Sequence, residues 1–206
     1  MSCKLVVGAG PLLDQAMAAW REREPGLDLR RIEVDPDAGR DALAAALDVI
    51  EDGASAFVAI DHRHLNFRRL ALVEMLRERG IPMMPLIEAG ALLAAGVEVG
   101  ANGWAGPGAI VRHGCVIGEN VVLGAGVIVG AGASIAASCW IGDGVVIGGH
   151  AGISAHVTLG LGVQVGQGVR IAECCVIDRP GRIEKDIAGR TFVHASHDGP
   201  IFIAGQ

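Results

Sequence analysis

Hydrophobic residues recur with two different periods along this chain, and the period changes near residue 88. In the first part, short apolar runs alternate with segments whose apolar residues have helical spacing. Strands are expected at 4–10, 27–35, 55–60 and 81–87, and helices at 11–24, 38–53 and 64–80. Strands that alternate with helices indicate βαβ units and a parallel sheet.

From Val99 to Ile183 an aliphatic residue returns at every sixth position without an insertion. Fourteen of these fifteen positions hold a large aliphatic residue, the second position is Gly in nine hexads, and the fifth is mostly small or Val. Three hexads make one triangular coil, so residue i is expected to stack on residue i+18. The first and fifth positions then point inward, and Gly gives the corners their backbone freedom.

The two periods together predict the fold class and the domains. An α/β Rossmann-like domain is expected at 1–88, a left-handed parallel β-helix of hexapeptide repeats at 89–188, and a C-terminal tail at 189–206. One coil alone is unstable, because only stacking on a neighbour pairs its backbone groups.

Composition narrows the function classes. The net charge of −6 argues against a general nucleic-acid binder, which needs a basic surface. No apolar run is long enough for a membrane span, and the first residues do not resemble a signal peptide, so a cytoplasmic protein is expected. The five cysteines include no CxxC pair, which favours reduced, mostly buried thiols over disulfides or structural zinc.

Two segments resemble a known family. Residues 58–87 read VAIDHRHLNFRRLALVEMLRERGIPMMPLI, and residues 138–166 read SCWIGDGVVIGGHAGISAHVTLGLGVQVG. They are similar to the linker region and the catalytic coils of sugar acyltransferases, the family of sialic-acid O-acetyltransferases and bacillosamine or perosamine N-acetyltransferases. The resemblance implies an acyl-CoA-dependent acyltransferase that assembles as a homotrimer.

The same resemblance implies where ligands bind. Acetyl-CoA is expected as acyl donor between neighbouring β-helices, with Gly148, Ala155 and Gly166 as candidate contacts. A nucleotide-sugar is expected on the N-terminal domain, at the loop Gly8-Ala9-Gly10 and at the strand ends near Asp35 and Asp61. A glycine turn between a strand and a helix also suits a phosphate, although such turns occur as plain tight turns as well.

Acyl transfer from a thioester needs a base, and a side chain must supply it. The family base is a His just before Cys-x-Ile-Gly, where this chain has Ala137 and Ser138. His156 stacks on Ser138 by the i+18 rule and is the leading candidate. His113 precedes a family-like Gly-Cys-Val-Ile-Gly string, but it is expected on another side of the triangle. His150 is one face away from His156.

Other histidines are weaker candidates. His62 and His64 follow the third strand, at the sheet edge where α/β proteins bind ligands. His194 and His197 lie in the polar tail and are either solvated or cover a neighbouring subunit's site. The family's Gly-x-Gly-Gly-His loop and closing Gly-x-Pro-Ala motif are both absent.

Three functions remain open. The first is an acyltransferase that modifies an amine or hydroxyl of a sugar. The second is a trimeric binding or scaffold protein of the same fold that has lost the reaction, as the absent histidines suggest. The third is a carbonic anhydrase of the β-helical type, which needs three His on zinc, and no suitable third partner for His150 and His156 is evident.

Overall fold

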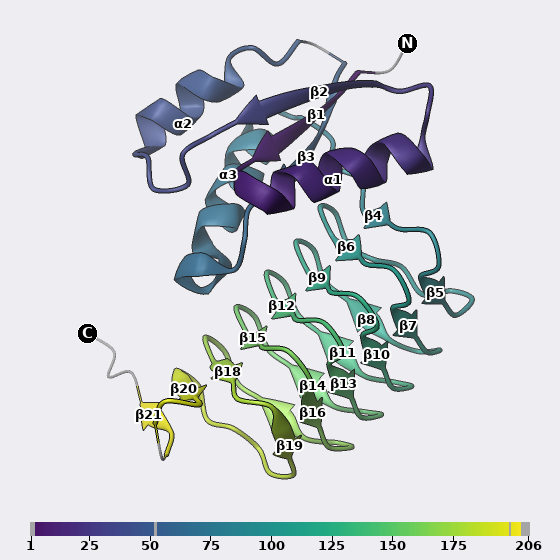
Figure 1. Cartoon of the computed structure of the whole chain (residues 1–206), viewed down its shortest axis with the longest axis vertical. Helices are drawn as coiled ribbons and strands as arrows, with labels where there is room; N and C mark the ends of the chain where they lie inside the picture. Colours follow the sequence, from purple (N-terminus) through teal and green to yellow (C-terminus); the bar gives the residue numbers. More distant parts are fainter. Residues whose placement is uncertain (1–2, 52, 198, 203–206) are drawn as a thin grey trace. The chain divides into compact units, whose positions relative to one another are not determined.

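The computed structural model describes residues 3–51, 53–197 and 199–202. The chain divides into two compact units, Met1–Leu86 and Ile87–Gln206 (Figure 1). The first is an α/β unit, and the second is a β-solenoid of stacked coils. No helix in the described part of the chain is long and apolar enough to cross a membrane.

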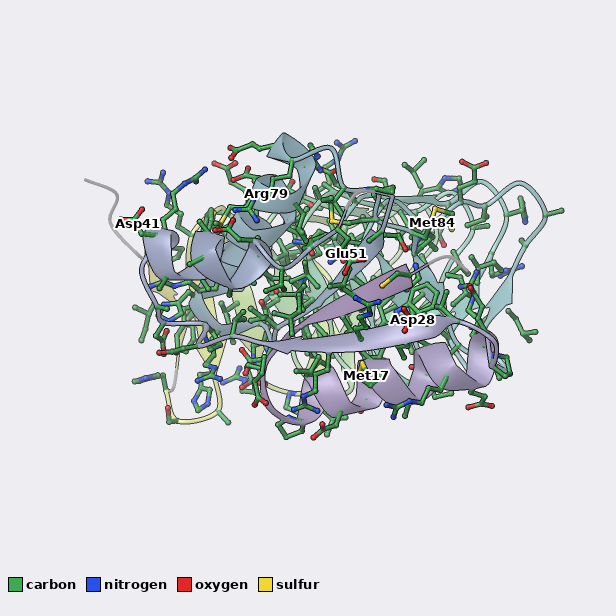
Figure 2. The ribbon with its side chains drawn as sticks, turned by 90° about the horizontal axis from the view of Figure 1, so that it is seen from above. Met17, Asp28, Asp41, Glu51, Arg79 and Met84 are labelled. Carbon is green, nitrogen blue, oxygen red and sulfur yellow. The ribbon has the colours of Figure 1, made fainter. Side chains whose placement is uncertain are left out.

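The α/β unit contains a parallel sheet with the strand order β2-β1-β3. Its elements are β1 (Cys3–Gly8), α1 (Gly10–Arg23), β2 (Asp28–Glu33), α2 (Arg40–Leu47), β3 (Ser55–Ala59), a short turn η1 (Arg63–Asn66) and α3 (Phe67–Glu78). Alternate residues of β1 serve opposite faces of the sheet. Leu5 and Val7 pack in the core that α2 and α3 cover, whereas Lys4 lies against Trp20 of α1. Figure 2 shows α1, which carries Met17, on one side of the strands.

The expected fourth strand does not join this sheet. Only Met83 forms an isolated bridge, to Ala56, and the next strand is β4 (Leu86–Ile87). Pro82 and Pro85 explain the difference, because proline has no backbone N–H and cannot donate to a ladder. The Pro82 carbonyl still accepts a hydrogen bond from Ala56 N at 2.9 Å.

The solenoid unit confirms a β-helical second half. Among the described residues its strands form sheets of six, four and eight strands. The six-stranded sheet contains β5 (Leu92–Leu93), β7 (Ile110–Val111), β10 (Ile128–Val129), β13 (Val146–Ile147), β16 (Val163–Val165) and β19 (Gly181–Ile183). The four-stranded sheet contains β8 (Val116–Ile117), β11 (Ser134–Ile135), β14 (Gly152–Ile153) and β17 (Arg170–Ile171). The eight-stranded sheet contains β4, β6 (Trp104–Ala105), β9 (Val122–Leu123), β12 (Trp140–Ile141), β15 (Thr158–Leu159), β18 (Val176–Asp178), β20 (Thr191–His194) and β21 (Ile201–Phe202).

Successive coils pair eighteen residues apart through most of the solenoid, as in the pair Ile135 and Ile153. In the regular coils the aliphatic residue at the first hexad position points inward, and one continuous buried core results. The small inward position comes two residues before it. Cys139, at such a position, donates its thiol hydrogen to the Ser154 carbonyl at 3.0 Å and is fully buried.

The corners differ from expectation. The left-handed backbone falls on the fourth hexad position, at every such position from Gly90 to Cys174. The second-position glycines serve another purpose, because a Cβ there would collide with the next coil. At Gly148 it would lie 2.5 Å from the backbone nitrogen of Gln167. Glycine at the second position therefore permits close stacking, and the fourth position makes the turn.

Candidate functional site

A shallow groove of about 380 Å³ crosses the outer face of the four-stranded sheet. Small outward-facing residues form most of its surface. At its centre Gly152 lies between Ser134 and Arg170 of the adjacent coils. A Cβ at Gly152 would lie 3.8 Å from both the Ser134 hydroxyl and the Arg170 Cγ atom. The groove is further lined by Val116, Gly118, Ile135, Ala136, Ile153 and Ser154.

Arg170 is the charged residue of this groove. Its backbone N–H donates to the Asp186 carboxylate at 2.8 Å. Its guanidinium has no ion-pair partner among the residues that the structure describes. An exposed arginine beside two serine hydroxyls is suited to a phosphate or carboxylate.

A column of polar residues occupies the corner between the four-stranded and eight-stranded sheets. We call it the polar corner; its members are Asn102, Asn120, Ser138, His156 and Cys174. The Asn102 amide nitrogen donates to the Asn120 side-chain oxygen at 3.0 Å, and the Asn120 amide nitrogen donates to the Ser138 hydroxyl at 3.0 Å. These three residues are buried, so the chain of hydrogen bonds satisfies amide groups that would be costly to leave unpaired.

The predicted stacking of His156 on Ser138 is present. The His156 backbone N–H donates to the Ala137 carbonyl at 3.2 Å. In the coil that follows His156, the Cys174 backbone N–H donates to the Ala155 carbonyl at 3.1 Å. Both side chains are half-buried. His156 follows the groove residue Ser154 by two positions, so the polar corner borders the groove along one edge.

The residues of the polar corner have a strained, left-handed backbone conformation. His156 has φ 58° and Ser138 has φ 57°, whereas the corresponding corner between the eight-stranded and six-stranded sheets is glycine at Gly108, Gly126, Gly144 and Gly162. A left-handed non-glycine residue costs about 1–2 kcal/mol, and such residues concentrate at functional sites. This conformational signal supports the polar corner as the functional edge of the groove.

The other predicted bases lie at the opposite edge of the groove. His113 is exposed in the corner between the six-stranded and four-stranded sheets, away from Ser138, as expected. His150 is exposed in the same corner with φ 57°. A Cβ at Gly132 would lie 2.6 Å from the His150 Nδ1 atom, so this ring lies against the preceding coil.

The three candidate acetyl-CoA contacts are not grouped together. Ala155 lies beside the groove, directly after Ser154. Gly148 and Gly166 follow strands of the six-stranded sheet and allow the close approach of adjacent coils. Their role as ligand contacts stays a prediction.

The cysteines fit a structural role. Cys175 is buried and donates to the Ala188 carbonyl at 3.1 Å, and burial raises the pKa of its thiol. Burial and the neighbouring Glu173 raise the pKa of Cys174, which opposes thiolate formation. Cys174 lies eighteen residues after His156 and stacks one coil from it.

The candidate nucleotide-sugar residues gather at the carboxyl edge of the α/β sheet (Figure 1). Gly8 ends β1 and is flanked by Glu33 of β2 and Ala59 of β3. A Cβ at Gly8 would lie 2.0 Å from the Ala59 carbonyl oxygen, so only glycine fits there. Ala9 precedes α1 and gives it no side-chain cap, and Gly10 begins the helix with φ 59°. Pro11 has no N–H, so the remaining N–H groups of this first turn are the ones that would suit an anion.

Acidic groups surround this edge. Asp35 accepts a hydrogen bond from Asp37 N at 2.9 Å, and the Asp37 carboxylate lies 3.3 Å from the His64 Nε2 atom. Asp61 accepts from the Arg63 guanidinium at 2.9 Å and from the Arg63 backbone N–H at 3.1 Å. Burial acts to raise the pKa of Asp61, but the bonds from Arg63 outweigh it and hold that pKa below its ordinary value.

A left-handed turn lies at the same edge and was not predicted. The spacing of apolar residues predicted one helix over 64–80, but His64, Leu65 and Asn66 have φ of 53°, 52° and 64°, and α3 begins at Phe67. Three successive non-glycine residues in this conformation are unusual. No turn signature such as Gly or Pro marks the segment, so the spacing of apolar residues suggested helix throughout.

The remaining histidines are placed apart from the groove. His194 lies on β20, stacks on Phe192 at 5.8 Å between ring centroids and lies 3.8 Å from the Asp178 carboxylate. His197 is exposed nearby. Within residues 3–51, 53–197 and 199–202, no group of three or more His, Cys, Asp or Glu side chains is arranged to hold a metal ion.

Comparisons with known proteins agree on the fold. The family described as the GMPPB C-terminal domain matches residues 99–188. No curated protein shows significant sequence similarity to the chain.

Three solved structures are similar over nearly the whole chain. A variant of perosamine N-acetyltransferase from Caulobacter crescentus, in complex with CoA and GDP-perosamine, is 21% identical, with a TM-score of 0.80 over 93% of each chain. The acetyltransferase domain of PglB from Neisseria gonorrhoeae, in complex with acetyl coenzyme A, is 18% identical, with a TM-score of 0.78 over 98% of this chain and 100% of that one. WeeI from Acinetobacter baumannii is 14% identical, with a TM-score of 0.56 over 97% of this chain and 100% of that one.

Proposed function

We propose that this protein is an acyl-CoA-dependent acyltransferase that modifies an amine or hydroxyl of a nucleotide-linked sugar, with acetyl-CoA as donor. The observation that carries the proposal is a small-residue groove that borders a corner with a strained, half-buried histidine. The fold supports it, since perosamine N-acetyltransferase and the PglB domain share this architecture and were crystallised with CoA or acetyl-CoA. We take the solenoid to be left-handed and the α/β unit to be Rossmann-like, as in the sugar acyltransferase family.

The groove is the proposed site of the donor. Its small residues leave room for the thin pantetheine arm of CoA along the sheet, and Ser134 and Ser154 offer hydroxyl groups to the amides of that arm. Arg170 stands at the C-terminal end of the groove and is free to bind a phosphate of the donor. The thioester would then lie toward the coil that contains Ser138.

His156 is the proposed base. Its imidazole takes the proton from the attacking amine or hydroxyl while that atom bonds to the thioester carbonyl carbon. The carbon–sulfur bond then breaks, and CoA leaves as a thiol after receiving a proton. Ser138 and Asn120 act as positioning residues, because their buried hydrogen bond fixes the corner next to His156. His113 is the second candidate base, from the opposite edge.

The α/β unit is the proposed site of the nucleotide-sugar. The start of α1, which lacks a side-chain cap, suits a diphosphate, and carboxylates such as Asp35 and Asp61 suit hydrogen-bond donors of the ribose or the base. Arg63 partly neutralises this acidic edge through its bond to Asp61.

A homotrimer is part of the proposal. A stripe of exposed aliphatic residues runs along the outer face of the six-stranded sheet, formed by Leu92, Ile110, Ile128 and Val146. Such a stripe is typical of a surface that is covered by a partner. We also propose a cytoplasmic location, where acyl-CoA is made.

Calorimetry with acetyl-CoA is the first test, followed by free-thiol release with a set of nucleotide-sugars. One site per subunit with micromolar affinity supports the proposal, and light scattering reports the oligomer. We expect His156→Ala to lower turnover at least tenfold, and His113→Ala is measured beside it. A larger loss in His113→Ala than in His156→Ala would make His113 the base. No binding at millimolar acetyl-CoA would favour the scaffold alternative, and unchanged turnover in His156→Ala would remove this base.

A further inference from the structure

The regular coil ends at Pro180. Fifteen successive corners use a left-handed residue at the fourth hexad position, and Pro180 occupies the next such position. Proline is locked near φ −65° and cannot adopt that conformation. The following coil is also two residues shorter, because Ile171 pairs with Ile187 and Ile177 pairs with Val193, each sixteen residues on.

A cavity of about 400 Å³ opens where this coil is distorted. Its floor contains the partly buried Ile183, Ile187 and Val193, and the buried Ile177 beneath them. Solenoids normally close this end with a polar capping element, because an exposed core favours association. Here the last coil presents an aliphatic surface inside a cavity.

The rim of the cavity is basic in a chain of net charge −6. Arg179, Arg182 and Lys185 face it, and the Arg182 guanidinium is paired with Glu184 at 3.2 Å. Arg179 and Lys185 have no ion-pair partner among the described residues. Two uncompensated cations therefore stand over an aliphatic floor.

The acids next to the rim are used elsewhere. The Asp186 carboxylate accepts the backbone N–H of Arg170, and the Asp178 carboxylate lies 3.8 Å from the His194 Nε2 atom. Neither residue lines the cavity. Within the described residues the positive charge of Arg179 and Lys185 is thus unbalanced, which is the arrangement expected of an anion site.

We propose that this cavity binds a small aliphatic anion, a carboxylate or phosphate monoester on a short hydrocarbon chain. The hydrocarbon chain packs on the partly buried Ile183, Ile187 and Val193, and the anionic group lies between Arg179 and Lys185. This site is separate from the donor groove and does not depend on the proposed transferase activity.

Octanoate is the first probe, titrated into the full-length protein with isoleucine δ1 methyl groups labelled for NMR. We expect the methyl signals of Ile177, Ile183 and Ile187 to shift, while that of Ile141, in the middle of the core, stays unchanged. Arg179→Gln and Lys185→Gln should each weaken binding about three- to tenfold, as expected for the loss of one partly exposed charge contact.

Control measurements separate charge from fold. Arg112→Gln removes an exposed cation elsewhere on the solenoid and should leave the affinity unchanged. Octanol, which lacks the charge, should bind at least tenfold more weakly than octanoate. Equal binding of octanol, or no methyl shift at millimolar octanoate, would overturn the proposal.

The identity of the anionic group is resolved by two further titrations. If octyl phosphate binds more tightly than octanoate, the site is assigned to a phosphate monoester. If octanoate binds more tightly, the site is assigned to a carboxylate. Acetyl-CoA is the competing source of phosphate. If acetyl-CoA displaces octanoate and shifts the same isoleucine methyl groups, the cavity belongs to the donor site and a separate anion site is refuted.

Discussion

Replacement of His156 by glycine should make the protein more stable and less active. His156 is held at φ 58°, a conformation that costs a non-glycine residue about 1–2 kcal/mol. Glycine removes this cost but loses roughly 0.5–1 kcal/mol more backbone entropy on folding. The net expectation is a gain of roughly 0.5–1 kcal/mol, and His156→Ala gains nothing because alanine keeps the strained backbone.

Urea denaturation followed by circular dichroism measures the effect. For a chain of this size the gain corresponds to about 1–4 °C in Tm. His150→Gly is the matched control, because His150 has φ 57° in a corner at the other edge of the groove. Both variants should be stabilised, and only His156→Gly should lose turnover, at least tenfold.

Gly144→Ala tests the same reasoning in the opposite direction. Gly144 has φ 65°, and a Cβ there would meet nothing within 4 Å, so alanine adds strain without a collision. It should destabilise the protein by roughly 0.5–1 kcal/mol. Destabilisation by both His156→Gly and His150→Gly would show that corner strain is not stored at these residues and would refute the reasoning.

Three further predictions follow from the contacts. Gly8→Ala forces a Cβ within 2.0 Å of the Ala59 carbonyl oxygen. We expect the free energy of unfolding, measured in urea, to fall by more than about 2 kcal/mol and nucleotide binding in calorimetry to be lost. A variant of wild-type stability would contradict the close approach. Asn120→Leu leaves Asn102 and Ser138 without their shared partner and should lower the free energy of unfolding by about 1–3 kcal/mol. A double-mutant cycle with Ser138→Ala measures the coupling, and an additive cycle would mean that the two side chains are not coupled. The pKa of Asp61 is lower in the folded than in the unfolded protein, so its bond to Arg63 stabilises the fold above about pH 3.9. This stabilisation is lost as the pH falls through the folded pKa, so the Tm difference between the wild type and Asp61→Asn should shrink in acid. A constant difference would argue against the bond.

The repeat is the part of this protein that the sequence reveals most directly. A six-residue period is local, and the requirement that each coil stack on its neighbour converts it into a defined register. The stacking of His156 on Ser138 followed from counting alone and is present. The assembly of Gly8, Asp35 and Asp61 at one sheet edge followed from strand order, because parallel strands end together.

Other features depend on non-local contacts. The hydrogen-bonded column from Asn102 to Ser138 joins residues eighteen apart, and its existence depends on three side chains pointing into the same corner. The groove depends on Gly152 lying between Ser134 and Arg170 in adjacent coils. The left-handed turn at His64 carries no glycine or proline signature, so apolar spacing misassigned it to a helix.

The sequence by itself therefore determined the two architectures and the register of the coils, because period and hydrophobic burial are properties of neighbouring residues. Only the tertiary structure decided which fourth-position residues bear strain, which cations lack a partner and where the last coil opens at Pro180. Those properties arise from side chains that meet across coils, and such contacts form only when the chain has folded.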